Sequence, residues 1–247
     1  MNEVNTKTLK ERSATRNLVS HLMKDRLAVI GLILVILITS SAILAPLIVP
    51  HNPNKINVRH RLKGPSAENW LGTDQLGRDV FSRVIVGSRI ALQVALVSIT
   101  IAGSCGLLLG MMAGYGSKKL DGILIILFDT VRSFPTIMFA LAVVTLVGPS
   151  LNTIILVVII TSIPVYGRIV RTQTQALKHN EFILAEKAMG AGKLRILGVH
   201  ILPNVIGPLL IIASMDIPVV VTIEAGLSFL GLGVRPPTAS WGSILND

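Results

Sequence analysis

Two long stretches of the chain carry no charged side chain, and they limit the fold more than any other feature. Residues 90–117 form one stretch of 28 residues, and residues 133–167 form another of 35. A helix that crosses a membrane needs about 20 apolar residues, whereas a transmembrane β-strand needs about 10 residues of alternating polarity. Charged residues make up only 15% of the chain. We therefore expect an all-α membrane protein with several spans, neither a soluble domain nor a barrel.

The balance of charge is basic, with a formal net charge of +10. This balance is found in nucleic-acid-binding proteins, but also in membrane proteins that concentrate Lys and Arg in cytoplasmic loops. The apolar stretches favour the second explanation, so no nucleic-acid partner is expected. The single cysteine, Cys105, lies in an apolar stretch and is expected to pack there. Neither a disulfide framework nor a metal or cofactor site is predicted.

The N-terminal region divides at residue 26. Residues 1–26 are polar and include six Lys or Arg residues, whereas residues 27–50 carry no charge. The apolar part of a secretory signal is only about 7–15 residues long, which favours an uncleaved transmembrane helix at 27–50 over a cleaved signal. The basic tail is then cytoplasmic, and the polar segment 51–87 is extracytoplasmic.

Residues 88–247 form the rest of the chain, and the pattern predicts four more spans there. These spans lie near residues 90–115, 120–147, 151–170 and 203–225, with a charged segment at 178–202 between the last two. Lys and Arg are more numerous on the side that this topology makes cytoplasmic, as expected for inner-membrane proteins. The sequence after residue 227 is a Gly- and Pro-rich tail without a closing span.

One face of the span at 90–115 consists of small residues at four-residue spacing: Ala102, Gly106, Gly110 and Gly114. Residues four apart lie on one face of a helix, and small side chains there allow a second helix to approach closely. We expect this face to be a helix-packing surface without a chemical role.

A short helix is predicted inside the segment 178–202, beginning at Asn180 and Glu181 and ending at Gly190. A weakly amphipathic helix of this kind can lie on the lipid surface or dock into a groove of another protein. Its small residues favour docking. The pair Gly192-Lys193 resembles the end of a phosphate-binding loop, but Lys187 and Leu194 stand where that loop needs Gly and Ser or Thr.

No nucleotide site and no catalytic set are therefore predicted, and we do not expect an enzyme. Four ionisable residues lie within predicted spans: Asp129, Arg132, Asp216 and Glu224. Such residues are costly in a membrane and usually face a partner or a water-filled path. The spacing of Asp129 and Arg132 predicts that they pair with each other on one helix face. The four residues are candidates for a translocation path or for intramembrane pairing.

Several motifs together resemble one family of transporters. They are residues 71–83 (LGTDQLGRDVFSR), Arg132-Ser133-Phe134-Pro135, His200-Ile201-Leu202-Pro203-Asn204, residues 227–233 (LSFLGLG) and Ser240-Trp241-Gly242. The chain is similar to the permease subunits of bacterial ABC importers for dipeptides, oligopeptides or nickel. It looks most like the second, C-type subunit of the pair.

This resemblance implies the type I ABC importer permease fold, in a multi-pass protein of the bacterial inner membrane. It also implies partners: a homologous permease subunit, two ATP-binding subunits that hydrolyse ATP, and an extracytoplasmic substrate-binding protein. The family has six spans, of which five are visible here, so a chain truncated at its C-terminus is expected. The substrate within the family, whether dipeptide, oligopeptide, nickel or glutathione, is not readable from the sequence.

The family couples to its ATPase through a Glu-Ala-Ala motif that is followed by Gly and later by Leu-Pro. Here Gly190 and Leu202-Pro203 match, but the acid occupies the third position of the triplet, at Glu186. The resemblance thus implies a coupling site formed by Leu184, Ala185, Glu186, Ala188, Met189 and Gly190. The alternative function is an ion-coupled secondary carrier that uses the carboxylates of Asp129, Asp216 and Glu224.

Overall fold

The computed structural model describes residues 23–247, and within them every regular element is a helix. Most of the predicted basic tail at 1–26 lies outside these residues. The chain divides into two compact units, one that ends at Ile48 and one that spans Val49–Asp247. Each unit is described by itself.

The first unit contains α2 (Arg26–Ile43) and the short α3 (Ala45–Ile48). Asp25 caps α2, because its carboxylate accepts a hydrogen bond of 2.9 Å from the amide of Leu27. The apolar side chains of α2 are largely exposed, and the helix is long and apolar enough to cross a membrane. The predicted single helix at 27–50 is therefore interrupted at Leu44, between α2 and α3.

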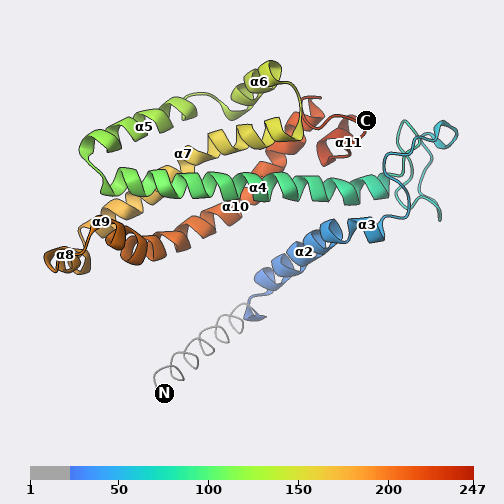
Figure 1. Cartoon of the computed structure of the whole chain (residues 1–247). Coiled ribbons are helices and arrows are strands. Elements are labelled where there is room, and N and C mark those ends of the chain that lie inside the picture. The colour runs from blue at the N-terminus through green and yellow to red at the C-terminus, as the bar shows by residue number, and fades with distance from the viewer. Residues whose placement is uncertain (1–22) are drawn as a thin grey trace. The chain divides into compact units, whose positions relative to one another are not determined.

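Two long helices form the centre of the second unit. They are α4 (Val80–Tyr115) and α7 (Leu151–Lys178), which make the most extensive helix contact in the described chain and run side by side in Figure 1. Both exceed their predicted spans. α4 begins ten residues earlier than residue 90, because the carboxylate of Asp79 caps its first turn by accepting from the amide of Ser82 at 2.8 Å.

The predicted span at 120–147 is wrong as a single helix. It consists of α5 (Lys118–Arg132) and α6 (Thr136–Val147), which meet at an angle of 82°. Proline at 135 lacks an amide hydrogen and disfavours helical geometry at Phe134. α5 therefore ends before it, and α6 begins with Pro135 as its N-cap.

The chain then passes through α8 (Glu181–Ala188) and α9 (Lys193–Arg195) into one long helical rod. This rod continues through a π-helical turn, η2 (Ile196–Ile201), into α10 (Leu202–Phe229). Pro203 provides the reason for the wide turn, because a proline in a regular helix clashes with the carbonyl four residues earlier. In Figure 1, α8 lies near one end of α10 and α11 lies near the other.

The predicted tail after residue 227 contains a short helix that the sequence did not indicate. α10 extends to Phe229, and the last residues form α11 (Trp241–Asn246), which packs against α10 and α4. The indole nitrogen of Trp241 donates a hydrogen bond of 3.0 Å to the carbonyl of Val84. The segment before α4, which includes the one-turn η1 (Val58–His60), has few regular elements.

The described residues thus contain four helices that are long and apolar enough to span a membrane, or five when α5 and α6 count as one broken span. The buried core of the second unit lies where α4, α7 and α10 meet, and it includes Val94, Ile154 and Val205. The all-helical membrane fold that the charge-free stretches predict is confirmed.

Candidate functional site

The predicted coupling segment forms a small projection between α7 and α10. In α8 the side chain of Ile183 is fully buried, and the helix packs against α7 and η2. Its other apolar side chains face outward: Phe182 is 44% exposed, Leu184 50% and Met189 74%. The helix therefore has one fully buried side chain and presents an uncovered apolar surface.

The residues of the predicted coupling site are not equivalent in the structure. Leu184, Ala185, Ala188, Met189 and Gly190 are exposed, whereas Glu186 is half-buried. The five exposed residues can meet another protein without any rearrangement of this chain. We therefore define them, together with Phe182, as the α8 surface.

Glu186 faces its own chain. Its carboxylate lies 3.4 Å from Nε2 of His200, at the end of η2, and the ring of Phe182 lies 6.4 Å from the same imidazole. The acid in the third place of the triplet thus contacts η2 of its own chain and is not part of the α8 surface.

Gly190 ends the α8 turn with a φ of +85°, a conformation that L side chains rarely adopt. No atom lies within 4 Å of the position where a Cβ would be built. The requirement for glycine is therefore one of backbone conformation and not of space within this chain.

The predicted pair of Asp129 and Arg132 is wrong. The carboxylate of Asp129 instead forms an ion pair with Arg168 of α7. A second ion pair ties the same two helices together, since Arg171 donates to Asp121 over 2.7 Å. α5 is thus fixed to α7 by two carboxylates, and no acidic side chain of the described residues lies within ion-pair distance of Arg132.

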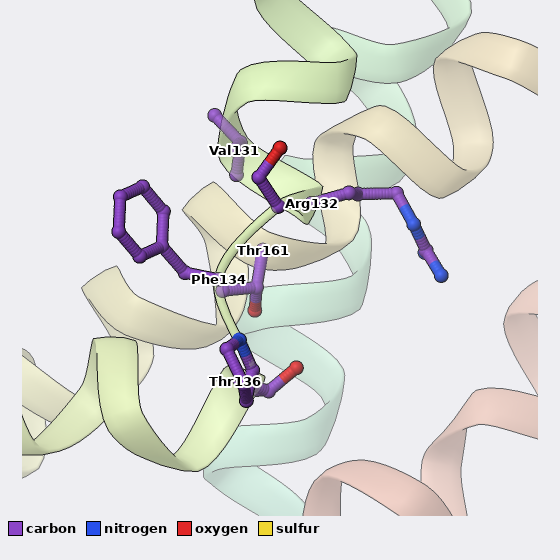
Figure 2. A pocket seen from close by; sticks show the side chains of 7 residues that line it. Val131, Arg132, Phe134, Thr136 and Thr161 are labelled. Carbon is purple, nitrogen blue, oxygen red and sulfur yellow. The ribbon is translucent and has the colours of Figure 1, made fainter.

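A cavity of about 340 Å³ lies at the bend between α5 and α6. Figure 2 shows its lining, in which the side chains of Arg132 and Phe134 leave the bend in opposite directions and Thr161 approaches from α7. Ser133 and Thr136 add polar groups. The cavity therefore lies where a membrane-spanning helix is interrupted, and its lining includes one charged and several hydroxyl-bearing side chains.

The two carboxylates of α10 differ in their surroundings. Glu224 is fully buried, and one of its oxygens accepts a hydrogen bond of 2.7 Å from Ser228. Asp216 is half-buried near the hydroxyl of Tyr166. In this conformation Glu224 does not line an open path within the described chain.

The small residues of α4 lie against α7. A Cβ on Gly106 would lie 2.6 Å from the Cβ of Tyr166, and one on Gly110 would lie 2.5 Å from the carbonyl oxygen of Gly167. A Cβ on Gly114 would meet Thr174 at 2.6 Å, and Ala102 is fully buried. The two helices therefore touch backbone to backbone along this seam, which the four-residue spacing predicts.

Sequence reasoning did not identify an arginine cluster at the far end of α4. Arg78 donates from Nε to Asp74 at 2.6 Å and from Nη2 to Asp247 at 2.7 Å. Arg83, only 1% exposed, pairs with the same two acids. We call these four residues the arginine cluster.

The acids of this region are stabilised in their charged form. Burial alone would raise the pKa of Asp74, but hydrogen bonds from Arg78 and Leu76 outweigh it and lower the pKa below the ordinary value. For Asp79, burial likewise acts to raise the pKa, and hydrogen bonds from Ser82 and Asn69 lower it overall.

Two signals could have revealed what the sequence reasoning missed. The cavity follows from Ser133-Phe134-Pro135, because a proline in the middle of an apolar stretch predicts a break. The arginine cluster follows from the alternation of acids and arginines at 74–83, although its fourth member, Asp247, is 164 residues away from Arg83.

Comparison with known proteins adds two family matches. Residues 106–247 match the family of binding-protein-dependent transport system inner membrane components. Residues 13–65 match the N-terminal transmembrane domain of oligopeptide transport permease C.

Individual relatives agree with these families. The dipeptide transport system permease protein DppC of Alkalihalophilus pseudofirmus is 39% identical over 235 residues, which cover 95% of this chain and 77% of that protein. DppC of Bacillus subtilis is 35% identical over 95% of this chain and 73% of its own length. The glutathione transport system permease protein GsiD of Pectobacterium atrosepticum is 36% identical over 96% and 79%.

Among solved structures, the MetNI methionine ABC transporter in inward-facing conformations matches with a TM-score of 0.46 and 22% identity, over 58% of this chain and 74% of that chain. The family match covers more than half of the chain, and the relatives cover nearly all of it. The chain therefore belongs to the binding-protein-dependent transport system inner membrane components and is a permease subunit of an ABC importer, with the all-helical fold of that family.

Proposed function

We propose that the chain forms part of the translocation path for peptides, with ATP hydrolysed by separate subunits that grip the α8 surface. Support for the substrate class comes from the relatives, two of which are dipeptide permeases. The proposed assembly contains a homologous permease subunit, two ATP-binding subunits and an extracytoplasmic binding protein. The N-terminus and α8 are then cytoplasmic.

The observation that carries the proposal is the asymmetry of α8. Its single fully buried side chain, Ile183, holds it against α7 and η2, while the α8 surface remains uncovered. A helix bound to lipid would need a wide apolar stripe, but here Glu181 and Lys187 interrupt a short one. A groove of another protein accommodates such a surface better.

The connections of α8 explain how a partner could move the path. α8 contacts the end of α7 and, through η2, the start of α10. These two helices also form much of the core around the membrane-spanning region. A displacement of α8 when the ATP-binding subunits close would therefore move both helices, so that nucleotide binding favours one of two arrangements of the path.

The proposal predicts that one charge on the α8 surface prevents assembly with the ATPase. Met189→Asp should reduce the ATP-binding subunits that co-purify with the permease by about tenfold or more, because it places an unpaired carboxylate in an apolar contact. The matched control is Ile56→Asp, a 58% exposed residue of the segment before α4.

The measurement is co-purification from membranes in which all subunits are expressed, together with ATP-dependent uptake of a labelled dipeptide. Equal recovery of the ATP-binding subunits with both variants would contradict the assignment of the α8 surface. Normal assembly without dipeptide uptake in the unmodified complex would instead contradict the substrate class.

The ion-coupled alternative receives no support from the comparisons. Two of its three proposed carboxylates also have partners within the described chain, since Asp129 pairs with Arg168 and Glu224 accepts from Ser228.

A further inference from the structure

We propose that the cavity at the bend between α5 and α6 binds a carboxylate group of the transported solute, with Arg132 as the residue that recognises its charge. This inference rests on the proposed function, because it assumes that the solute passes this point. The cavity of about 340 Å³ is within the size range of small-molecule sites, about 300–1,000 Å³.

The first argument is the charge of Arg132. Arg132 ends α5 at the bend of a broken membrane span, and its side chain is exposed in the described chain, so in a membrane it needs a partner or water to offset the cost of its charge. The described acids of the neighbouring helices have other partners: Asp129 pairs with Arg168, and Asp121 pairs with Arg171. The cavity therefore carries one uncompensated positive charge and attracts an anion.

The second argument is the lining around that charge. Ser133, Thr136 and Thr161 bring hydroxyl groups to the cavity, and these can donate hydrogen bonds to carboxylate oxygens. Thr161 comes from α7, so the lining combines residues of the bend with one residue of a neighbouring helix (Figure 2).

The ends of the two helices contribute in opposite directions. The carbonyl groups at the end of α5 carry partial negative charge and favour the guanidinium of Arg132. The amide groups at the start of α6 carry partial positive charge and favour a negative group, since no side chain caps them. The arrangement is therefore suited to an anion held between Arg132 and the start of α6. A cation would be repelled by the guanidinium of Arg132 and is therefore disfavoured.

An acidic side chain of the homologous permease subunit is the competing partner for Arg132. The two cases differ in what the cavity offers to solutes. If a protein carboxylate neutralises Arg132, the ratio of anionic to cationic labelling rates should be no higher in the cavity than at a neutral position, and loss of Arg132 should lower it below that level because the carboxylate is left unpaired. If the charge is free, anionic reagents should be favoured.

The test uses the assembled complex with Cys105→Ala and a single new thiol, Thr136→Cys. Labelling rates are measured with methanethiosulfonate reagents of similar size and opposite charge. We expect the ratio of anionic to cationic rates to exceed that of a control thiol, to fall about tenfold toward the control value when Arg132→Gln is added, and to be largely retained with Arg132→Lys. The control thiol is Leu146→Cys at the other end of α6, whose ratio should not change.

A second measurement examines the carboxylate itself. A transported dipeptide should slow labelling of the Thr136→Cys thiol by the anionic reagent, and its C-terminally amidated analogue should not. A ratio at the Thr136→Cys thiol that is no higher than that of the control thiol while Arg132 is present, or a thiol that neither reagent reaches, would overturn the proposal. Because labelling does not require uptake, this failure is distinct from a failure of the proposed function, which would abolish transport and leave the labelling ratio intact.

Discussion

The two ends of the second unit are held together in different ways. At one end, the arginine cluster and α11 tie the start of α4 to the last residues of the chain, and Arg83 is almost completely buried. At the other end, α8 is held by the side chain of Ile183 and by one contact of 3.4 Å between Glu186 and His200. The first end is therefore held by several buried contacts. The second end is held by fewer contacts, which agrees with the coupling role that we propose for α8.

The largest expected effect is at the end with the arginine cluster. Asp74→Ala should destabilise the protein by about 3–5 kcal/mol, because it leaves the buried Arg78 and Arg83 with only Asp247 as an acidic partner. The readout is the apparent Tm of the purified complex. Glu68→Ala is the control, since Glu68 is exposed in the same segment and forms no ion pair in the described structure. Equal Tm values for the Asp74→Ala and Glu68→Ala complexes would show that the arginine cluster does not stabilise this end more than the α8 end is stabilised.

An intermediate effect is expected at the seam that connects the two ends. Gly110→Ala should cost about 1–3 kcal/mol, because its Cβ would lie 2.5 Å from a backbone carbonyl that cannot move without shifting α7. Gly103→Ala is the matched control on the same helix, with no atom within 4 Å of the new Cβ. That change should be neutral or stabilise by up to about 1 kcal/mol, since alanine favours helix. Similar Tm values for both variants would argue against close contact of α4 and α7.

The smallest effect is expected at the α8 end. Glu186→Gln removes the charge of a carboxylate whose contact with His200 is partly open to solvent, and should cost less than about 1 kcal/mol while changing dipeptide uptake by no more than about twofold. Glu181→Gln, an exposed acid of the same helix, should behave alike. Loss of the ATP-binding subunits with Glu186→Gln alone would instead assign Glu186 to the contact with the ATPase.

Much of the fold could be predicted because membrane spans depend on local composition. The charge-free stretches and the small-residue face of α4 are each properties of a single helix. Such properties can be recognised in a short stretch of sequence. The short helix at 181–188 was predictable for the same reason, from its spacing and from the glycine that follows it.

The rest depends on contacts between segments that are far apart. Spacing alone favoured Arg132 as the partner of Asp129, and only the packing of α7 brings Arg168 closer. The packing of Trp241 against α4 likewise depends on a contact between segments that are far apart in the sequence. The bend at Pro135 was a different case, because the apolar stretch continues through it and hydropathy does not register the turn.

The π-helical turn before α10 keeps a stripe of buried residues in phase. Ile196 and Ile201 are both buried at a spacing of five, and the stripe then continues at spacings of four through Val205 and Leu209. In a regular α-helix, two residues five apart would point about 140° away from each other. The one extra residue in the turn thus sets the rotation of the preceding segment, α8 included, about the axis of α10. If the turn before Pro203 became regular α-helix, that segment would rotate around this axis.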